Sequence, residues 1–274
     1  CLLSRGLGDV YKRQELYGEP DGSFPNHHPD PSKLENMEDL IKSVKKNNSL
    51  VGLAFDGDGD RLGVISPKGE MIFPDRQMIM FSRQVIQSNP NAKIVFDVKC
   101  SKLLSDEIER LQGKPLICKT GHTFIKQKIR ETDALLGGEM SGHIFFNDRW
   151  PGFDDGIYAG ARMLEIIANS EQDDPFVTVP NMLSTPEINI PAADEEKFNI
   201  VKTFIENSNF SDAKIVSIDG IRVEFEKSWG LLRPSNTSPC LVLRFEAETN
   251  DDLNKIKEIF YLGLKSIKPN IYKF

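Results

Sequence analysis

The sequence predicts an α/β protein that ends in a smaller α+β domain. Apolar runs of buried-strand length alternate with amphipathic helical patterns between residues 50 and 170. Prolines then break the periodicity between residues 173 and 191, as in a linker, and an amphipathic pattern closes the chain. Strands that alternate with helices of these lengths favour parallel pairing, so we expect a layered α/β core.

The first predicted elements surround an acidic loop. Residues 50–55 and 62–65 are apolar and of strand length, whereas the run 56–61 between them is charged and rich in glycine. A turn signal at 67–70 leads to a short strand, and a helix is expected to open near Asp75.

The middle of the chain repeats a strand and helix unit. Residues 92–98 and 114–119 are predicted strands, and helices are expected from Ser101 and over 121–132. Asp154 and Asp155 are expected to open a further helix, because carboxylates are favourable at the positive end of a helix dipole. The apolar residues that mark this last helix are Ile157, Ala161, Leu164 and Ile167.

The C-terminal domain is expected to begin near Ser184. We expect a helix over 194–207, a hairpin-like pair of strands across 215–225 and a strand at 240–245. A closing amphipathic helix has apolar residues at intervals of three and four. These are Leu253, Ile256, Phe260, Leu264 and Ile267.

Residues 1–14 are expected to be a non-native leader. They show neither helical or strand periodicity nor the charged-then-apolar order of a signal peptide. Asp9 to Gln14 also matches one reading frame of a common transposase sequencing adapter. We therefore expect the natural protein to be longer at its N-terminus.

Composition excludes several classes of partner. The chain has 274 residues with 34 basic and 41 acidic side chains, and no basic cluster is interleaved with aromatic residues, so no nucleic acid partner is expected. No apolar run is long enough to cross a membrane. The four cysteines have no CxxC spacing, which argues against a disulfide framework and favours a reducing compartment. The expected location is cytoplasmic.

The acidic loop has the composition of a site for one divalent cation. Asp56, Asp58 and Asp60 alternate with glycines, which let the backbone curl the carboxylates toward one point. Mg²⁺ is the first candidate. A calcium-binding EF-hand needs Gly and Glu where this chain has Arg61 and Pro67, so that alternative fails. The alternative that stays open is a solvated acidic turn with no bound ion.

Two later loops have the donor and acceptor groups of a sugar and phosphate site. Glu139 and Ser141, within the glycine-rich run 137–143, could hold vicinal hydroxyls. The loop 233–239 combines a guanidinium, hydroxyls and an amide, which suits a phosphate dianion. Solvated turns that bond only their own backbone are the alternative at both places. The residues proposed in the second loop are Arg233, Ser235, Asn236 and Thr237.

Basic side chains follow two predicted strands. Lys99, Lys119 and His122 lie at strand ends, where ligands of open α/β sheets bind, so they are candidates for phosphate contact or proton transfer. For His122 a capping or surface role is the alternative. His27 and His28 are adjacent in an extended segment and point to opposite faces, which favours a structural role over a shared metal.

Together, the metal, hydroxyl and phosphate loops resemble those of the α-D-phosphohexomutase family, over essentially residues 15–274. Stretches 25–31, 119–122 and 149–156 also match. Gly59 and Met140 are similar to the bacterial phosphomannomutase/phosphoglucomutase branch. The resemblance implies mixed α/β/α domains of the phosphohexomutase type followed by a small α+β domain. The implied ranges are 15–73 for the later part of the second domain, 74–184 for the third and 185–274 for the fourth.

The resemblance also implies an activity and roles. The family moves a phosphoryl group between O1 and O6 of a hexose through a hexose 1,6-bisphosphate. Asp56, Asp58 and Asp60 would then hold one Mg²⁺, with Arg61 supporting the phosphoryl group. Glu139 and Ser141 would grip the sugar and the loop from Arg233 the distal phosphate. The pocket would be completed by Lys99, Lys119, His122 and His143.

One departure from the family pattern limits what this chain can do alone. The family's phosphoryl donor is a phosphoserine in a Thr-x-Ser-His-Asn-Pro-like loop, and no histidine of this chain follows a serine. We expect the 274-residue chain to be inactive by itself. A non-catalytic sugar-phosphate binding protein is the alternative, and a haloacid-dehalogenase-like phosphatase is a weaker one. Preference for mannose or glucose stays open, and a monomer or weak dimer is expected.

Overall fold

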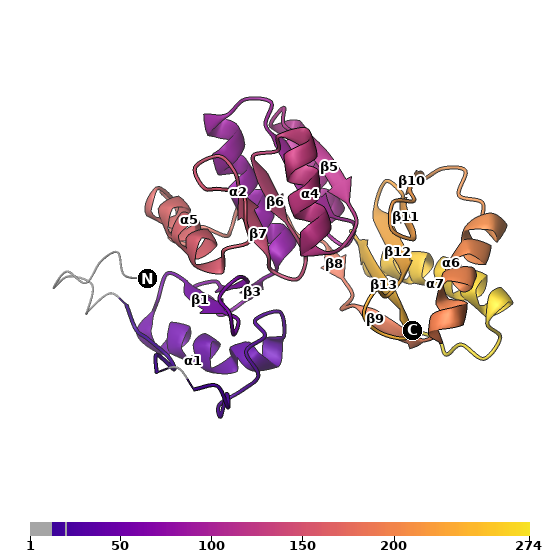
Figure 1. Cartoon of the computed structure of the whole chain (residues 1–274), viewed down its shortest axis with the longest axis horizontal. Helices are drawn as coiled ribbons and strands as arrows, with labels where there is room; N and C mark the ends of the chain where they lie inside the picture. Colours follow the sequence, from indigo (N-terminus) through magenta and orange to yellow (C-terminus); the bar gives the residue numbers. More distant parts are fainter. Residues whose placement is uncertain (1–12, 20) are drawn as a thin grey trace.

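The computed structural model describes residues 13–19 and 21–274 (Figure 1). Most of the predicted leader, residues 1–12, lies outside the described residues. Figure 1 shows three successive units in chain order, with a first small unit beside a central α/β unit and a C-terminal domain on its other side. Within the described part, no helix combines the length and apolarity needed to cross a membrane.

The first unit is a small antiparallel sheet covered by one helix. It contains a 3₁₀ turn, η1 (Leu34–Met37), helix α1 (Glu38–Asn47), and strands β1 (Gly52–Phe55), β2 (Leu62–Ile65) and β3 (Met71–Ile72) in the order β1-β2-β3. Both predicted strands are confirmed. Met37 and Val44 pack with Ile65 to form a local core, so the acidic loop projects from a hairpin whose base is fixed by burial.

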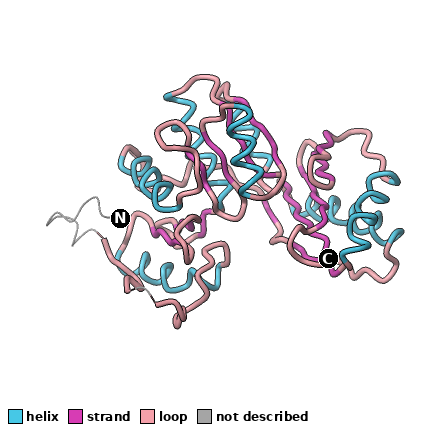
Figure 2. The backbone as a smooth tube through the Cα atoms, in the orientation of Figure 1, coloured by secondary structure: helices cyan, strands magenta, loops and turns pink. Residues whose placement is uncertain are grey.

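The central unit has the predicted parallel pairing. Its sheet runs β5-β4-β6-β7, with β4 parallel to β5 and β6, and β7 antiparallel to β6. The elements are α2 (Pro74–Ser88), β4 (Lys93–Asp97), α3 (Lys102–Arg110), β5 (Lys114–Cys118), α4 (His122–Thr132), β6 (Leu136–Gly138), β7 (Ile144–Phe146) and α5 (Gly156–Ala168). Figure 2 shows helices over this sheet.

The glycine-rich run of residues 137–143 is shorter as a loop than we expected. Gly137 and Gly138 belong to β6, and a Cβ atom at Gly138 would lie 2.4 Å from Sδ of Met78. Glycine is required there because α2 packs directly on the strand. The loop is therefore the tip of the hairpin between β6 and β7.

Helix α5 begins as predicted but buries a different side. Asp155 is its N-cap and accepts a hydrogen bond of 2.8 Å from the backbone N–H of Tyr158. Ala159 and Met163 are fully buried, whereas Ile157 and Leu164 are 48% and 47% exposed. The apolar spacing predicted the wrong buried face of the helix. The helix also contains small residues, and the face that carries them packs closely against the core.

The C-terminal domain is an antiparallel sheet of six strands with two helices packed on it. The stretch 183–191, interpreted as part of a linker, pairs with this sheet as β8 (Leu183–Ser184) and β9 (Ile188–Pro191). Strand β12 (Ser228–Pro234) was not predicted and includes Arg233. The other elements are α6 (Asp194–Asn207), β10 (Lys214–Val216), β11 (Ile221–Glu224), β13 (Cys240–Ala247) and α7 (Asn250–Ile267).

Buried charged side chains join the C-terminal domain to the central unit. Arg222 donates to the carbonyl oxygens of Val98 and Cys100, at 2.7 and 2.5 Å, and its guanidinium lies 3.9 Å from the ring centroid of Trp229. Arg244 donates to Asp75 at 3.0 Å. These contacts flank Lys99, so they fix one candidate site residue between two units.

Candidate active site

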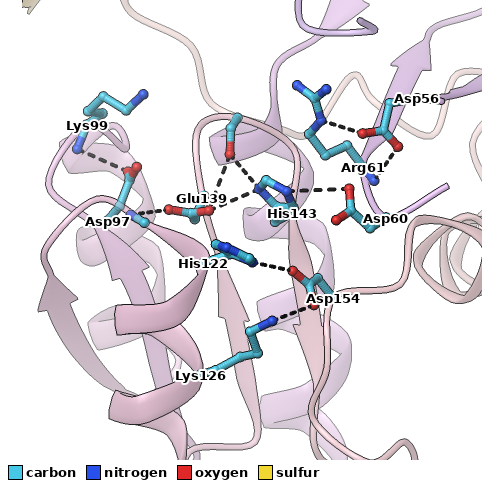
Figure 3. A network of polar contacts seen from close by, with 12 residues as sticks. Asp56, Asp60, Arg61, Asp97, Lys99, His122, Lys126, Glu139, His143 and Asp154 are labelled. Carbon is cyan, nitrogen blue, oxygen red and sulfur yellow. Dashed lines mark hydrogen bonds and ion pairs between the residues drawn. The ribbon is translucent and has the colours of Figure 1, made fainter. Parts of the chain in front are cut away.

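The acidic loop is closed by its own arginine. Gly59 has a φ of 79°, as expected for a turn that glycine permits. The backbone N–H of Arg61 donates to Asp56 at 3.0 Å, its Nε donates to the same carboxylate at 2.6 Å, and its Nη1 reaches Asp30 at 3.2 Å. The Arg61 side chain is thus held by two carboxylates, Asp56, which Figure 3 shows, and Asp30.

The three aspartates of this loop fit a divalent cation. Asp56, Asp58 and Asp60 each offer a carboxylate oxygen, and these oxygens lie within 4.8 Å of one another. Burial raises the pKa of Asp60, and the carboxylates of Asp56 and Asp58 raise it further, despite the opposing effect of His143. A divalent cation would remove this repulsion, and all-oxygen ligands suit Mg²⁺.

The sugar-loop candidates form one hydrogen-bonded cluster at the hairpin tip. Glu139 is 2% exposed and accepts from the backbone N–H of Gly121 at 2.5 Å. Ser141 Oγ lies 3.4 Å from Glu139 Oε2 and 2.9 Å from His143 Nδ1. A buried carboxylate and a hydroxyl therefore face the same place, which suits recognition of vicinal hydroxyl groups.

His143 connects the hairpin tip to the acidic loop. Its Nδ1 lies 3.0 Å from Glu139, and its Nε2 lies 3.4 Å from Asp60. Burial lowers the pKa of His143, but the hydrogen bond and charge of Glu139 outweigh burial and raise it, and Asp60 adds to this effect. The backbone N–H of Leu62 donates to Gly142 at 3.1 Å, so the two loops are joined by main chain as well.

His122 stands at the start of α4, next to the same cluster. Its ring stacks on that of His143 with centroids 5.5 Å apart and planes at 24°. Its Nδ1 lies 3.1 Å from Asp154, which also accepts from Lys126 at 3.0 Å (Figure 3). Asp154 was expected only to open a helix, and Lys126 was not predicted, because nothing in their local pattern indicates contact with His122.

Lys99 is a buried cation between two carboxylates. It is 8% exposed and its Nζ donates to Glu187 at 2.7 Å. Burial lowers the pKa of Lys99, but Asp97 and Glu187 raise it above its ordinary value, so the ammonium stays charged. Glu187 lies just before β9 and was not predicted; only the fold brings it to Lys99.

Arg233 lies at the end of β12 rather than in a free loop. Its Nε donates to Asp219 at 2.9 Å, and Asp219 accepts from the backbone N–H of Thr120 at 3.2 Å. Within residues 13–19 and 21–274, its buried Nη2 has no hydrogen-bond partner. This N–H group can donate a hydrogen bond to an anionic oxygen. Asp219 was also not predicted.

The remaining candidates of the phosphate loop differ in exposure. Ser235 is buried, and its Oγ accepts from the backbone N–H groups of Thr237 and Ser238 at 3.3 and 3.1 Å. This is the turn arrangement weighed as the alternative, although the hydroxyl can still donate. Asn236, Thr237 and Lys119 are exposed, so ligand contacts by these three residues stay predictions.

A chain of contacts links the three loops. It runs from Arg233 through Asp219 and the 120–121 backbone to Glu139, and then through His143 to Asp60. The sequence models of one family match in the same order. They are described as phosphoglucomutase/phosphomannomutase alpha/beta/alpha domain II over residues 3–69, domain III over 73–177 and the C-terminal domain over 187–262. The chain belongs to the phosphoglucomutase/phosphomannomutase family.

Relatives of this family are similar along nearly the whole chain. A phosphomannomutase/phosphoglucomutase of Pseudomonas syringae is 51% identical over 93% of this chain, and a phosphoglucomutase of Neisseria gonorrhoeae is 47% identical over 96%. A solved family protein from Burkholderia thailandensis superposes with a TM-score of 0.90 at 45% identity over 95%. The chain spans 56%, 58% and 56% of these proteins, respectively.

Proposed function

We propose that this chain is the metal- and substrate-binding part of an enzyme that interconverts hexose 1-phosphate and hexose 6-phosphate. The hexose would be mannose or glucose, and hexose 1,6-bisphosphate would be the intermediate. The observation that carries the proposal is the continuous set of contacts from Asp60 through His143 and Glu139 to Arg233. The names of the relatives, phosphomannomutase/phosphoglucomutase and phosphoglucomutase, agree with it.

Each cluster has a task in this proposal. Asp56, Asp58 and Asp60 would hold one Mg²⁺, which supplies charge neutralisation for the transferring phosphoryl group. Arg61 is oriented by Asp56 and Asp30 to support the same group. Hydroxyl groups of the hexose would bind Glu139 and Ser141.

The distal phosphate would bind where two buried cations converge. Arg233 provides an Nη2 that has no hydrogen-bond partner among the described residues, and Lys99 provides an ammonium whose pKa the charge of Arg233 acts to lower. Ser235, Asn236, Thr237 and Lys119 would complete this region. His122 and His143 would accept and return the proton of the reacting hydroxyl.

Turnover needs a phosphoryl donor that the family carries in a phosphoserine loop, so we propose that the 274-residue chain binds substrate without converting it. Glucose 1-phosphate or mannose 1-phosphate should bind saturably in calorimetry with Mg²⁺. Arg233→Gln should lose this binding, whereas Arg149→Gln should keep it, because Arg149 is exposed and paired with Glu165. Absent binding, or equal binding by Arg233→Gln, would contradict the proposed site.

Catalysis is tested separately. The chain alone, given hexose 1-phosphate, Mg²⁺ and glucose 1,6-bisphosphate, should form no hexose 6-phosphate, and substantial conversion would refute its proposed inactivity. Joined to the preceding part of the Pseudomonas syringae relative, the chain should restore conversion. A folded, inactive fusion would count against the mutase function.

The proposal places the protein in the cytoplasm as a monomer or weak dimer. Thiols support the compartment, because Cys100, Cys118 and Cys240 are free cysteines among the described residues. Fractionation of the source cells and sedimentation at several concentrations test these two statements.

A further inference from the structure

Asp154 is fixed in the segment that connects β7 to α5. Its main chain pairs with Phe145, and the next backbone N–H, of Asp155, donates to Ile144 at 3.3 Å. The backbone N–H of Gly156 donates to the carbonyl oxygen of Gly59, in the acidic loop, at 3.0 Å. The Asp154 side chain is only 10% exposed. Its carboxylate therefore has a defined position beside both loops.

Both oxygens of this carboxylate contact side chains of helix α4. Oδ2 lies 3.1 Å from Nδ1 of His122, and Oδ1 lies 3.0 Å from Nζ of Lys126, one turn further along α4. Burial alone would raise the pKa of Asp154, but the hydrogen bonds from Lys126 and His122 lower it. The group is thus a carboxylate, which can only accept hydrogen bonds.

An acceptor at Nδ1 decides which nitrogen of a neutral imidazole carries the proton. The proton must be on Nδ1, so Nε2 of His122 keeps its lone pair. The ring also stacks on His143, which contacts Ser141 and Glu139. The ring that carries this lone pair therefore lies against His143, next to the side chains assigned to the hexose hydroxyls.

We infer that Asp154 is a positioning residue that holds His122 with Nδ1 protonated and Nε2 free to accept the proton of a reacting hexose hydroxyl. The chemical consequence rests on the proposed function. The hydroxyl oxygen forms a bond to phosphorus while the bond from phosphorus to the phosphoserine oxygen breaks, and that oxygen keeps the electron pair. The hydroxyl proton moves to Nε2 and is returned in the reverse transfer.

Lys126 provides the matched control. The alternative explanation is that Asp154 serves only as the ion-pair partner of Lys126. Lys126→Met removes that pair and leaves the bond to His122. In Asp154→Asn, Lys126 should hold the amide oxygen, since an ammonium needs an acceptor. The amide NH₂ then faces His122 Nδ1, which must become the acceptor and move the proton to Nε2.

The first test measures this proton in the 274-residue chain by ¹⁵N NMR of its four histidines at a pH where they are neutral. His122→Asn assigns the signals, and circular dichroism checks folding. Wild type and Lys126→Met should show His122 protonated at Nδ1, and Asp154→Asn should show it protonated at Nε2. An unchanged tautomer in folded Asp154→Asn, or the same inversion in Lys126→Met, would overturn the inference.

The second test uses the fusion of this chain to the preceding part of the Pseudomonas syringae relative. Asp154→Asn should lower kcat by about 10- to 100-fold with KM changed less than about twofold, in the range of a misplaced general base. Lys126→Met should keep kcat within about twofold. If the unmutated fusion has no activity, the mutase function fails while the tautomer result still stands. A normal kcat in Asp154→Asn would overturn the positioning role by itself.

Discussion

The buried guanidinium of Arg222 should be the most consequential single side chain for the stability of the contact between the central unit and the C-terminal domain. It is completely buried, bonds two carbonyl groups of the central unit and pairs with Glu224 at 2.6 Å. We predict that Arg222→Met destabilises the chain strongly, because it leaves Glu224 buried without its closest cation.

The magnitude follows from what is lost and what replaces it. Three charge-assisted hydrogen bonds contribute about 1.5 kcal/mol each, and the desolvated contact with Trp229 contributes about 2 kcal/mol. A buried Met side chain returns about 2 kcal/mol. The expected net loss is about 4.5 kcal/mol, within the range observed when one partner of a buried ion pair is removed.

Lys214 provides the control, because it approaches the same Glu224 carboxylate at 3.6 Å while its side chain is 63% exposed. Lys214→Met should cost less than about 1 kcal/mol. Urea unfolding, followed by fluorescence of Trp229 with Trp150 replaced by Phe, measures both variants. A cost below about 1 kcal/mol for Arg222→Met, or equal costs for the two variants, would refute the reasoning.

Three further changes probe other parts of the chain. Asp58→Asn should abolish the rise in melting temperature that Mg²⁺ produces over EDTA, because one carboxylate of the cluster is neutralised; an unchanged rise would contradict the metal site. Hydrogen bonds from Arg110 and Arg83 lower the pKa of Glu107 from 4.5 to about 2, so its stabilising charge is complete above pH 4.5 and lost as the pH falls toward 2. Glu107→Gln should therefore destabilise at pH 7 and converge with wild type near pH 2 in urea unfolding, and a gap independent of pH would disagree. Gly156→Ala should cost about 1–3 kcal/mol, because its Cβ would lie 2.6 Å from the Arg61 carbonyl oxygen, whereas Gly22→Ala should stay within about 0.5 kcal/mol, since nothing lies within 4 Å of its Cβ; similar melting curves for both would argue against tight docking of the metal loop.

Most of the architecture followed from patterns within short stretches of sequence. Strand 93–97 has a buried apolar centre at 94–96, strand 114–118 contains the apolar run 116–118, and the closing helix repeats its apolar residues at helical spacing. The misses came where local pattern and packing differ. Strand β12 carries the polar end of the predicted phosphate loop, and α5 buries small residues while two of its large apolar residues stay exposed.

The sequence by itself determined which residues can perform the chemistry. Three aspartates separated by glycines, a carboxylate and hydroxyl in a tight turn, and an arginine beside hydroxyls indicate metal, sugar and phosphate recognition from their functional groups alone. Such assignments need only the chain, because each cluster is contiguous and its groups are brought together by one turn.

Only the tertiary structure decided how these groups are oriented and paired. Asp154 reaches His122 across 32 positions, and Glu187 reaches Lys99 across 88. Asp219 joins Arg233 to the start of α4. These carboxylates leave no local signal, since their partners come from different elements of the fold. The physical reason is that charge and tautomer depend on neighbours in space, which sequence distance does not specify.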